Sequence, residues 1–291
     1  MDVSIVIPCR NSAKTIAATL EGLVTQTWPG DCEIIVADNG STDHLVSVLQ
    51  SYQGRLPLLR HIHASERRGP SHARNVGVRR AMGERILFCD ADDVPAAGWA
   101  MAMAEGLKTH SFVACRQDFQ KLNAPAMRVA RDQTQVAALQ RFKALPFPHA
   151  GSGTLGIARA LHEAVGGFDE SIPICEDIDY CMRVQSTGVQ LQLITEAMLH
   201  IRLRHDVSDI MAQASHYAEY EVYLFKKYGN TSMRDWWRWR QYGQRWLSLL
   251  IRGPELLKTC EGRTMLAWHL GRQVGLLKGS LRFGASPISI E

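Results

Sequence analysis

Short apolar runs alternate with stretches of helical periodicity along the first third of the chain. The apolar runs cover residues 3–8, 33–37, 58–62 and 85–89, and the helical stretches between them cover residues 12–24, 45–49 and 71–82. Apolar strands separated by helices are typical of a parallel sheet that is covered on both faces. We therefore expect an α/β fold built on a Rossmann-like, mostly parallel sheet flanked by helices.

Polar clusters follow three of these predicted strands. They are Pro8-Cys-Arg-Asn11, Asp38-Asn-Gly-Ser-Thr-Asp43 and Asp90-Ala-Asp-Asp93. Right-handed crossovers bring the carboxyl ends of parallel strands to one edge of the sheet, where ligands bind in such folds. The sequence thus predicts a binding site at this edge.

The alternation weakens after Asp93. Prolines flank a predicted helix over residues 134–144, a strand is expected over residues 190–199, and the pattern is helical beyond about residue 205. We expect one α/β domain over residues 1–205 and a helical C-terminal extension over residues 206–291.

Composition narrows the class of protein. The net charge of +4 is small for 291 residues, so nucleic acid is not an expected partner. The seven cysteines are scattered without a CxxC pair, which favours buried free thiols in a reducing compartment. We see no signal peptide and no apolar stretch near the ~20 residues that span a bilayer. The expected location is the cytoplasm, at most on a membrane face.

The acidic cluster after the fourth strand is the sharpest chemical feature. Asp90, Asp92 and Asp93 crowd three carboxylates into four residues. Such crowding is unfavourable unless a cation compensates, and Mn²⁺ or Mg²⁺ prefers carboxylate and phosphate oxygens. The alternative is a solvated acidic turn before a helix that starts near Pro95. The polar ends of the neighbouring strands favour the metal site.

The successive motifs resemble those of family 2 glycosyltransferases, in order and spacing, over about residues 3–205. The resemblance is carried by the segments at residues 3–11, 34–43, 69–77, 90–93, 166–170 (Gly-Gly-Phe-Asp-Glu) and 176–183. It implies the GT-A fold, an inverting transfer and a nucleoside diphosphate sugar donor. The acceptor would be a hydroxyl of a glycan, a lipid-linked molecule or a small molecule.

The resemblance also implies roles for residues of the donor site. Pro8 and Asn11 fall where the family lines the nucleoside pocket, and Asp38 falls where an Asp reads the base, most often uracil. The family usually has a second Asp where this chain has Asn39, and a Tyr or Thr where it has Cys9. These two departures leave the base open between UDP and the other nucleotides.

The resemblance also implies which residues contact the ribose and the phosphates, which one binds the metal and which one takes the proton. Arg74 matches an Arg near the base and phosphates, Asp90 a position near the ribose, and Asp92 the metal ligand. Asp177 matches the general base that takes the acceptor proton, and Glu176 beside it is expected at the substrate.

A structural interpretation of the acidic helix start stays open. Asp177 and its neighbours can simply cap the helix, with Asp179 pairing Arg183 at i, i+4. We favour Asp177 as the base, because crowding by Glu176 and Asp179 raises a carboxyl pKa towards a useful value.

Two further segments are weaker candidates. His200 and His205 follow the last predicted strand and could reach the metal or the diphosphate, although a histidine there is more often a hydrogen-bonded structural residue. Gly151-Ser-Gly-Thr154 is expected to border the acceptor.

The segment at residues 234–252 interleaves tryptophan with arginine. Trp236, Trp239, Trp246 and Leu250 approximate one helical face, which can lie on an anionic membrane surface. The alternative is a helix packed on the catalytic domain. We favour the membrane, because many members of the family that the chain resembles act on lipid-linked acceptors.

Two other functions compete with glycosyl transfer. A sugar nucleotidyltransferase carries a glycine-rich loop after the first strand, and this chain has Pro8-Cys-Arg-Asn-Ser12 without glycine. The other is a non-catalytic nucleotide-sugar-binding or scaffolding protein with a decayed site, and the intact Asp90, Asp92 and Asp177 argue against decay.

Overall fold

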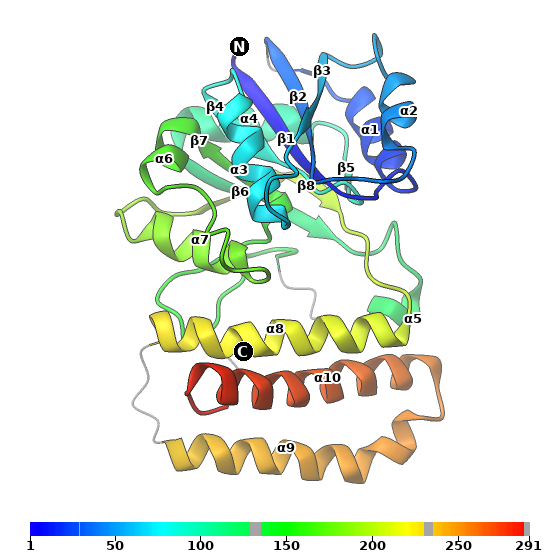
Figure 1. The fold of residues 1–291 in the computed structure, drawn as a ribbon, viewed down its shortest axis with the longest axis vertical. Coiled ribbons are helices and arrows are strands. Elements are labelled where there is room, and N and C mark those ends of the chain that lie inside the picture. The colour runs from blue at the N-terminus through cyan, green and yellow to red at the C-terminus, as the bar shows by residue number, and fades with distance from the viewer. Residues whose placement is uncertain (29, 129–134, 230–234, 288–291) are drawn as a thin grey trace. The chain divides into compact units, whose positions relative to one another are not determined.

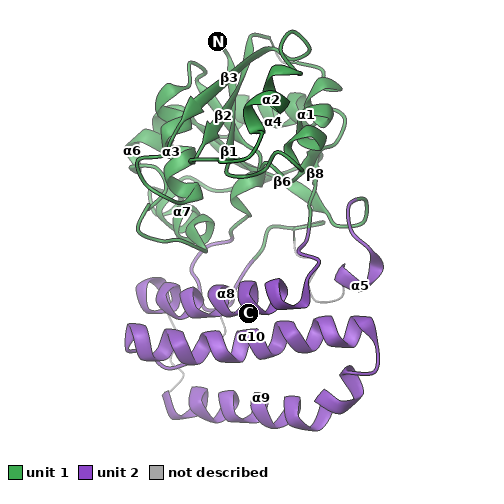
Figure 2. Cartoon of the chain, turned by 45° about the vertical axis from the view of Figure 1, so that its right-hand side comes forward, with its two compact units in different colours: residues 1–121, 134–140, 149–202 green, residues 122–133, 141–148, 203–291 purple. Residues whose placement is uncertain are grey.

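The computed structural model of the protein describes residues 1–28, 30–128, 135–229 and 235–287. Its contacts divide the chain into two compact units, coloured separately in Figure 2. Unit 1 comprises Met1–Lys121, Thr134–Gln140 and His149–Arg202, and unit 2 comprises Leu122–Gln133, Arg141–Pro148 and Leu203–Glu291, apart from the residues outside the described ranges. Two segments inside the expected domain 1–205 thus cluster with the later helices, because they add no strand to the sheet.

Unit 1 is built on one sheet of eight strands in the order β3-β2-β1-β4-β7-β6-β8-β5. The strands are β1 (Val3–Cys9), β2 (Cys32–Asp38), β3 (Leu58–His63), β4 (Arg85–Phe88), β5 (Val94–Pro95), β6 (Phe112–Asp118), β7 (Leu155–Ala158) and β8 (Gln192–His200). The pairs among β1, β2, β3 and β4 are parallel, as is β6 with β8, whereas β7 and β5 pair antiparallel to their neighbours.

Helices cover the sheet on both faces, and their apolar sides complete the core. They are α1 (Ile16–Val24), α2 (Leu45–Gln50), α3 (Pro70–Arg80), α4 (Trp99–Thr109), α6 (Arg159–Ala164) and α7 (Glu176–Gln185), with a short 3-10 helix η1 (Ser152–Thr154) before β7 (Figure 1). The β1 and β2 strands are almost wholly buried, as their continuous apolar runs require. The expected α/β class and the mostly parallel sheet are confirmed.

The helix predicted over residues 134–144 is wrong. Residue 134 lies outside the described ranges, and residues 135–144 form turns and a bridge between Gln140 and His149. The Gln135 carbonyl accepts from the Gln117 amide, and its side chain donates to the Cys115 carbonyl. These bonds to β6 replace the i to i−4 bonds that a helix would make.

Unit 2 contains the long helices α8 (Val207–Tyr228), α9 (Asp235–Leu256) and α10 (Cys260–Phe283), together with the short α5 (Pro125–Arg128), which packs on α10. A helical C-terminal extension was expected and is confirmed. Among the described residues, no helix is both long and apolar enough to cross a membrane.

A stripe of glycine allows α8 and α10 to approach closely. A Cβ at Gly271, Gly275 or Gly279 would collide with a backbone carbonyl of α8, at Met211, Ser215 and Glu219 respectively. Small residues four apart let helix backbones approach in this way. Beside the stripe, the Arg272 guanidinium binds both carboxylate oxygens of the buried Glu221, at 2.9 and 2.8 Å.

All seven cysteines are free thiols. Six are buried and Cys260 is exposed. The expectation of free, mostly buried cysteines therefore holds, with Cys260 as the exception.

Candidate active site

The polar segments after β1 and β2 are tied to one another at the carboxyl edge of the sheet. Asn11 has a left-handed backbone (φ 51°), its side-chain oxygen accepts from the Thr42 amide at 2.8 Å, and its amide donates to Ser41 Oγ at 3.0 Å. Asp43 accepts from the Ala13 amide at 2.9 Å. Pro8 lies next to Ala37 in the sheet register. The structure thus brings Pro8, Asn11 and the 38–43 turn together, as the sequence predicts.

Asp38 stands at the end of β2 and is only 5% exposed. One carboxylate oxygen accepts from the Ser41 amide at 2.8 Å, and the other lies 3.2 Å from His61 Nε2 on β3. Burial by itself would raise the pKa of Asp38, but the bonds from Ser41 and His61 outweigh it and lower the pKa. The side chain is therefore a fixed anion at neutral pH.

Arg74 connects the strand-end carboxylates to α7. It projects from α3, is 3% exposed, and donates to Asp90 Oδ1 at 2.6 Å and to Glu176 Oε1 at 2.9 Å. Burial would lower the pKa of Arg74, and the charges of Asp90 and Glu176 raise it instead. One cation thus holds together residues 74, 90 and 176, all three predicted as site residues.

Asp177 lies next to this ion-pair cluster. Its carboxylate accepts from the Ile178 amide at 2.8 Å and from the Ser152 backbone. Desolvation, followed by the charge of Glu176, raises the pKa of Asp177 from 3.8 to about 7. The neighbouring Asp179 instead pairs with Arg183 at 2.7 Å, as the structural interpretation of this helix predicted for that residue.

The acidic cluster at residues 90–93 divides into three roles. Asp90 faces Arg74, whereas Asp93 is 5% exposed and accepts from the Arg202 amide at 2.9 Å. Burial and the charges of Asp92 and Asp90 raise the pKa of Asp93 well above 3.8. Asp92 is half-buried, and the Arg202 guanidinium binds its backbone carbonyl at 3.1 Å. A partly accessible carboxylate in such crowding fits a hard divalent cation.

The 3-10 helix η1 contacts β4 and places Gly153 beside Asp90. A Cβ on Gly153 would lie 2.8 Å from the Asp90 carboxylate carbon, so only glycine fits there. The segment Gly151–Thr154, expected at the acceptor, is therefore in contact with Asp90.

His200 is held by a carboxylate. Its Nδ1 lies 2.6 Å from Asp118 Oδ2, and its Nε2 lies 3.4 Å from the Lys121 ammonium. The two strands place His200 opposite Asp118 on one side and Val94 on the other, close after the acidic cluster. His205 is exposed and belongs to unit 2.

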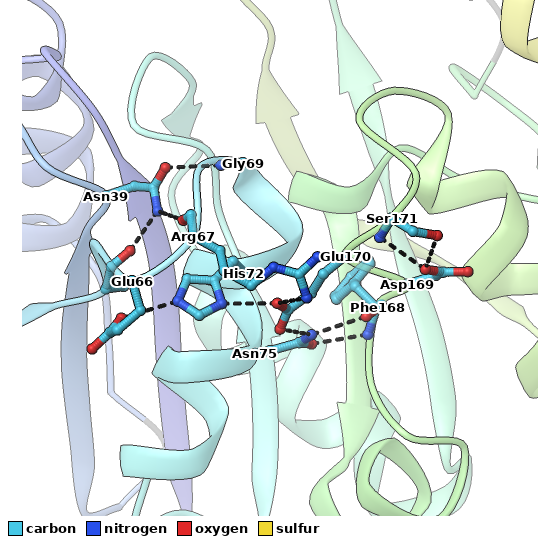
Figure 3. A network of polar contacts seen from close by, with 11 residues as sticks. Asn39, Glu66, Arg67, Gly69, His72, Asn75, Phe168, Asp169, Glu170 and Ser171 are labelled. Carbon is cyan, nitrogen blue, oxygen red and sulfur yellow. Dashed lines mark hydrogen bonds and ion pairs between the residues drawn. The ribbon is translucent and has the colours of Figure 1, made fainter.

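Asn39 performs a task that sequence reasoning missed. Its side-chain nitrogen donates to the Ala64 and Arg67 carbonyls, and its oxygen accepts from the Gly69 amide at 2.9 Å (Figure 3). An Asp here could not donate to two carbonyls. The departure from the family pattern thus fastens the loop that leads into α3.

The Gly166–Glu170 loop is fastened to the same helix. Asn75 binds both the Phe168 backbone amide and its carbonyl, at 2.9 Å each, and donates to Glu170 (Figure 3). His72 lies between Glu170 and Glu66, at 2.9 and 3.0 Å. These bonds from Asn75 and His72 fix the Gly166–Glu170 loop against α3, which carries Arg74.

A cavity of about 690 Å³ beside this loop is lined by Arg67, Arg79 and Arg183, among others, and by none of the predicted site residues.

Comparison with known proteins identifies the family. The model of glycosyl transferase family 2 matches residues 4–165. The chain belongs to glycosyl transferase family 2. This match begins within β1 and covers the first four of the six motifs that carry the resemblance, apart from Val3, and it ends just before the fifth.

Curated relatives share parts of this family 2 chain. The pre-mycofactocin glycosyltransferase of Mycobacterium tuberculosis is 26% identical over 226 residues, covering 74% of this chain and 46% of that protein. The uncharacterized glycosyltransferase YibD of Escherichia coli is 38% identical over 91 residues, covering 31% of this chain and 26% of its own length. The chain thus matches less than half of the length of these relatives.

Solved structures share the fold. The mannosyltransferase PcManGT from Pyrobaculum calidifontis, in complex with GDP-Man and Mn²⁺, superposes with a TM-score of 0.68 at 20% identity, covering 95% of this chain and 86% of that one. Residues 1–349 of TarS from S. aureus, in complex with UDP, superpose with a TM-score of 0.54 at 17% identity, covering 98% and 92%.

Proposed function

We propose that this protein is an inverting, metal-dependent glycosyltransferase of the GT-A type. It would move a sugar from a nucleoside diphosphate sugar, UDP-sugar first, to a hydroxyl of a glycan, a lipid-linked molecule or a small molecule. The observation that carries the proposal is Arg74, buried between Asp90 and Glu176 beside Asp177, in a family 2 chain. Proteins of the same fold, solved in complex with GDP-Man and Mn²⁺ and with UDP-GlcNAc, support a nucleotide-sugar donor.

In this proposal the donor lies along the carboxyl edge of the sheet. Pro8, Asn11 and Asp38 line the nucleoside end, and Asp38 accepts from the base. Asp90 faces the ribose, while Arg74 supplies a buried positive charge towards the diphosphate. Asp92 would hold Mn²⁺ or Mg²⁺, which when bound offsets the charge that develops on the leaving diphosphate.

Asp177 takes the proton in this proposal. Inversion by direct displacement needs one general base at the acceptor hydroxyl. A carboxyl group with a pKa of about 7 is matched to that task at neutral pH, because it is largely ionised yet basic enough to accept a proton. Glu176, fixed by Arg74, keeps this base in an acidic neighbourhood next to the substrate.

The donor site is tested by thermal shift with UDP, GDP, dTDP and CDP, each with and without Mn²⁺. The variants are Asp92→Asn and, as a matched control, Asp209→Asn, which removes an exposed carboxylate of unit 2. Ligands that bind the native state raise Tm. We expect a metal-dependent rise with one nucleotide that Asp92→Asn loses and Asp209→Asn keeps.

Assays of sugar transfer, donor hydrolysis and pyrophosphate release, run beside the thermal-shift panel, separate the rival functions. Binding of a nucleotide sugar without transfer or hydrolysis would point to a non-catalytic binding protein. Release of pyrophosphate from a nucleoside triphosphate and a sugar phosphate would point to a nucleotidyltransferase. No Tm rise with any nucleotide would contradict the donor site itself.

We further propose that α9 rests on an anionic membrane surface at the cytoplasmic face. Its exposed apolar side chains lie on one helical face and include Trp236, Trp239, Leu247, Leu250 and Ile251, the last two 71% exposed. The same helix has four arginines and only two acidic residues, which favours anionic lipid. A lipid-linked acceptor would be found in that membrane.

Vesicle sedimentation tests this membrane contact. We expect binding to vesicles of anionic phospholipid at low salt and none to neutral vesicles. Leu250→Ser combined with Ile251→Ser should reduce binding about tenfold or more, whereas Leu281→Ser, at a 78% exposed position of α10, should not. Equal sedimentation of all three proteins would exclude α9 as the contact.

A further inference from the structure

Two histidines of the edge strand β3 share a face with Asp38. His61 and His63 are two residues apart, so their side chains point to the same side of the sheet, and the register places His63 opposite Asp38. The His61 and His63 rings lie 5.0 Å apart, and His61 Nε2 is 3.2 Å from Asp38 Oδ2. One ligand atom from each of the three residues lies within 4.8 Å of the others.

The donor set suits a borderline transition metal. Two imidazole nitrogens and one carboxylate oxygen, with an open fourth position, form a tetrahedral Zn²⁺ site. Ligand atoms in such a site are about 3.4 Å apart, given bond lengths of about 2.0–2.1 Å. Small side-chain rotations would therefore close the 4.8 Å cluster around an ion.

The surroundings favour binding as well. The Ser41 amide, at 2.8 Å, fixes the second oxygen of Asp38 and so orients the carboxylate, as outer-shell partners do in metal sites. Asp38 is buried, whereas His63 is exposed, so an ion can enter from solvent.

This cluster is separate from the predicted catalytic metal position. Asp92 follows β4, and β1 lies between β4 and β2 in the sheet. Strands are about 4.8 Å apart, so Asp38 and the end of β4 are on the order of 10 Å from each other. Carboxylate and phosphate oxygens at Asp92 suit Mn²⁺ or Mg²⁺, whereas imidazole suits zinc.

We propose that Asp38, His61 and His63 bind a transition metal ion such as Zn²⁺, and that this ion competes with the donor nucleotide. The competition rests on the proposed function, in which Asp38 accepts from the base. A bound ion takes the Asp38 oxygen that faces the histidines and so withdraws this carboxylate from the base. Zinc therefore inhibits at the base end of the site, while Mn²⁺ or Mg²⁺ supports the reaction at the diphosphate end.

Equilibrium zinc titration tests the site without any nucleotide. It is carried out on the full chain with Cys260→Ser, which removes the one exposed thiol, and with Mg²⁺ in excess. We expect one strong site that His61→Gln and His63→Gln each weaken at least tenfold. His216→Gln, at an exposed position of α8, is the matched control and should change nothing. Zinc affinity unchanged in both cluster variants would overturn the site.

The second measurement is UDP affinity with and without saturating Zn²⁺. Zinc should weaken UDP binding at least tenfold in the parent protein and leave it unchanged in His63→Gln. Equal UDP affinity with and without zinc would overturn the competition. If UDP does not bind at all, the donor site and the competition both fail, whereas the metal site stands or falls on the zinc titration alone.

Discussion

Asp177 is the proposed general base, and its buried carboxylate lowers the free energy of unfolding when it is ionised. Its pKa in the folded protein is about 7, against 3.8 as a reference for the unfolded chain. Between these values the folded state binds more protons than the unfolded state, so the free energy of unfolding contributed by this group falls as pH rises from about 3.8 to 7. The ionised form that catalysis needs is the form that destabilises the fold.

The first prediction concerns the variant Asp177→Asn. Donor hydrolysis or transfer should fall at least about 100-fold, since a general base contributes 10²–10⁴. Tm should rise relative to the parent protein, and more at pH 8 than at pH 5, because only the parent carries the buried charge. In the parent, kcat should increase with pH up to about 7 and then level off. A Tm that falls equally at both pH values would contradict this role.

A second prediction at the residue scale concerns Asn39. Replacing it with Asp removes the donors to the Ala64 and Arg67 carbonyls and brings a carboxylate against them. We expect a loss of about 1–3 kcal/mol in the free energy of unfolding. Urea denaturation measures it, with Gln50→Glu at an exposed position of α2 as the control. A gain in stability would show that the loop after β3 is held by other contacts.

Some residues of the candidate site could be named from the sequence and others could not. The sequence pattern pointed to Asp38, Asp90 and Asp92 because each stands at or just after the end of an apolar strand. The carboxyl ends of parallel strands meet at one edge of the sheet. The cluster of Asp38 with His61 and His63 was missed, since only the register of β2 against β3 brings them together. The His-x-His pair at the end of a predicted strand was the signal available.

At the scale of elements, the alternation of strands and helices predicts β1 to β4 and α1 to α3 well. Strands β1, β2 and β4 are largely apolar and buried, and the edge strand β3 was recognised from its apolar residues despite Arg60, His61 and His63. The antiparallel β7 was not predicted, because four residues carry too little pattern. The segment 135–144 was misread as a helix, since its bonds to β6 are long-range and leave no periodic trace.

The third prediction uses the glycine stripe of α10. Gly275→Ala places a methyl group against the Ser215 carbonyl of α8 and should cost about 1–3 kcal/mol of unfolding free energy. The matched change Gly243→Ala in α9 meets no atom within 4 Å, so it should stabilise by up to about 1 kcal/mol through helix propensity. Thermal unfolding of the two variants should therefore shift in opposite directions. Stabilisation by both changes would contradict the close approach of α8 and α10.

At the scale of the whole molecule, the predicted donor, metal and base residues all belong to unit 1, whereas the weaker candidate His205 and the exposed apolar face of α9 belong to unit 2. This separation follows from the order of elements along the chain, in which the strands come first and the long helices come last. Strand ends provide directed polar groups, whereas long helices provide surfaces. The proposed chemistry and the proposed membrane contact can therefore be altered independently.

The fourth prediction tests this independence by hydrogen exchange. Saturating UDP with Mn²⁺ should slow exchange in residues 38–43 and 90–93 of unit 1, because ligand binding lowers the population of open states there. Exchange in α10 should stay as it is in the free protein. Protection of α10 equal to that of the strand ends would show that the two units open together.

The glycine stripe also restricts how the length of α10 can vary among relatives. A helix turns about 100° for each residue, so inserting or deleting one residue between Gly271 and Gly279 would rotate part of the stripe away from α8. Larger side chains would then stand where the helix backbones meet. Insertions and deletions should therefore be absent from this segment and collect in the loops on either side, even where individual residues differ freely.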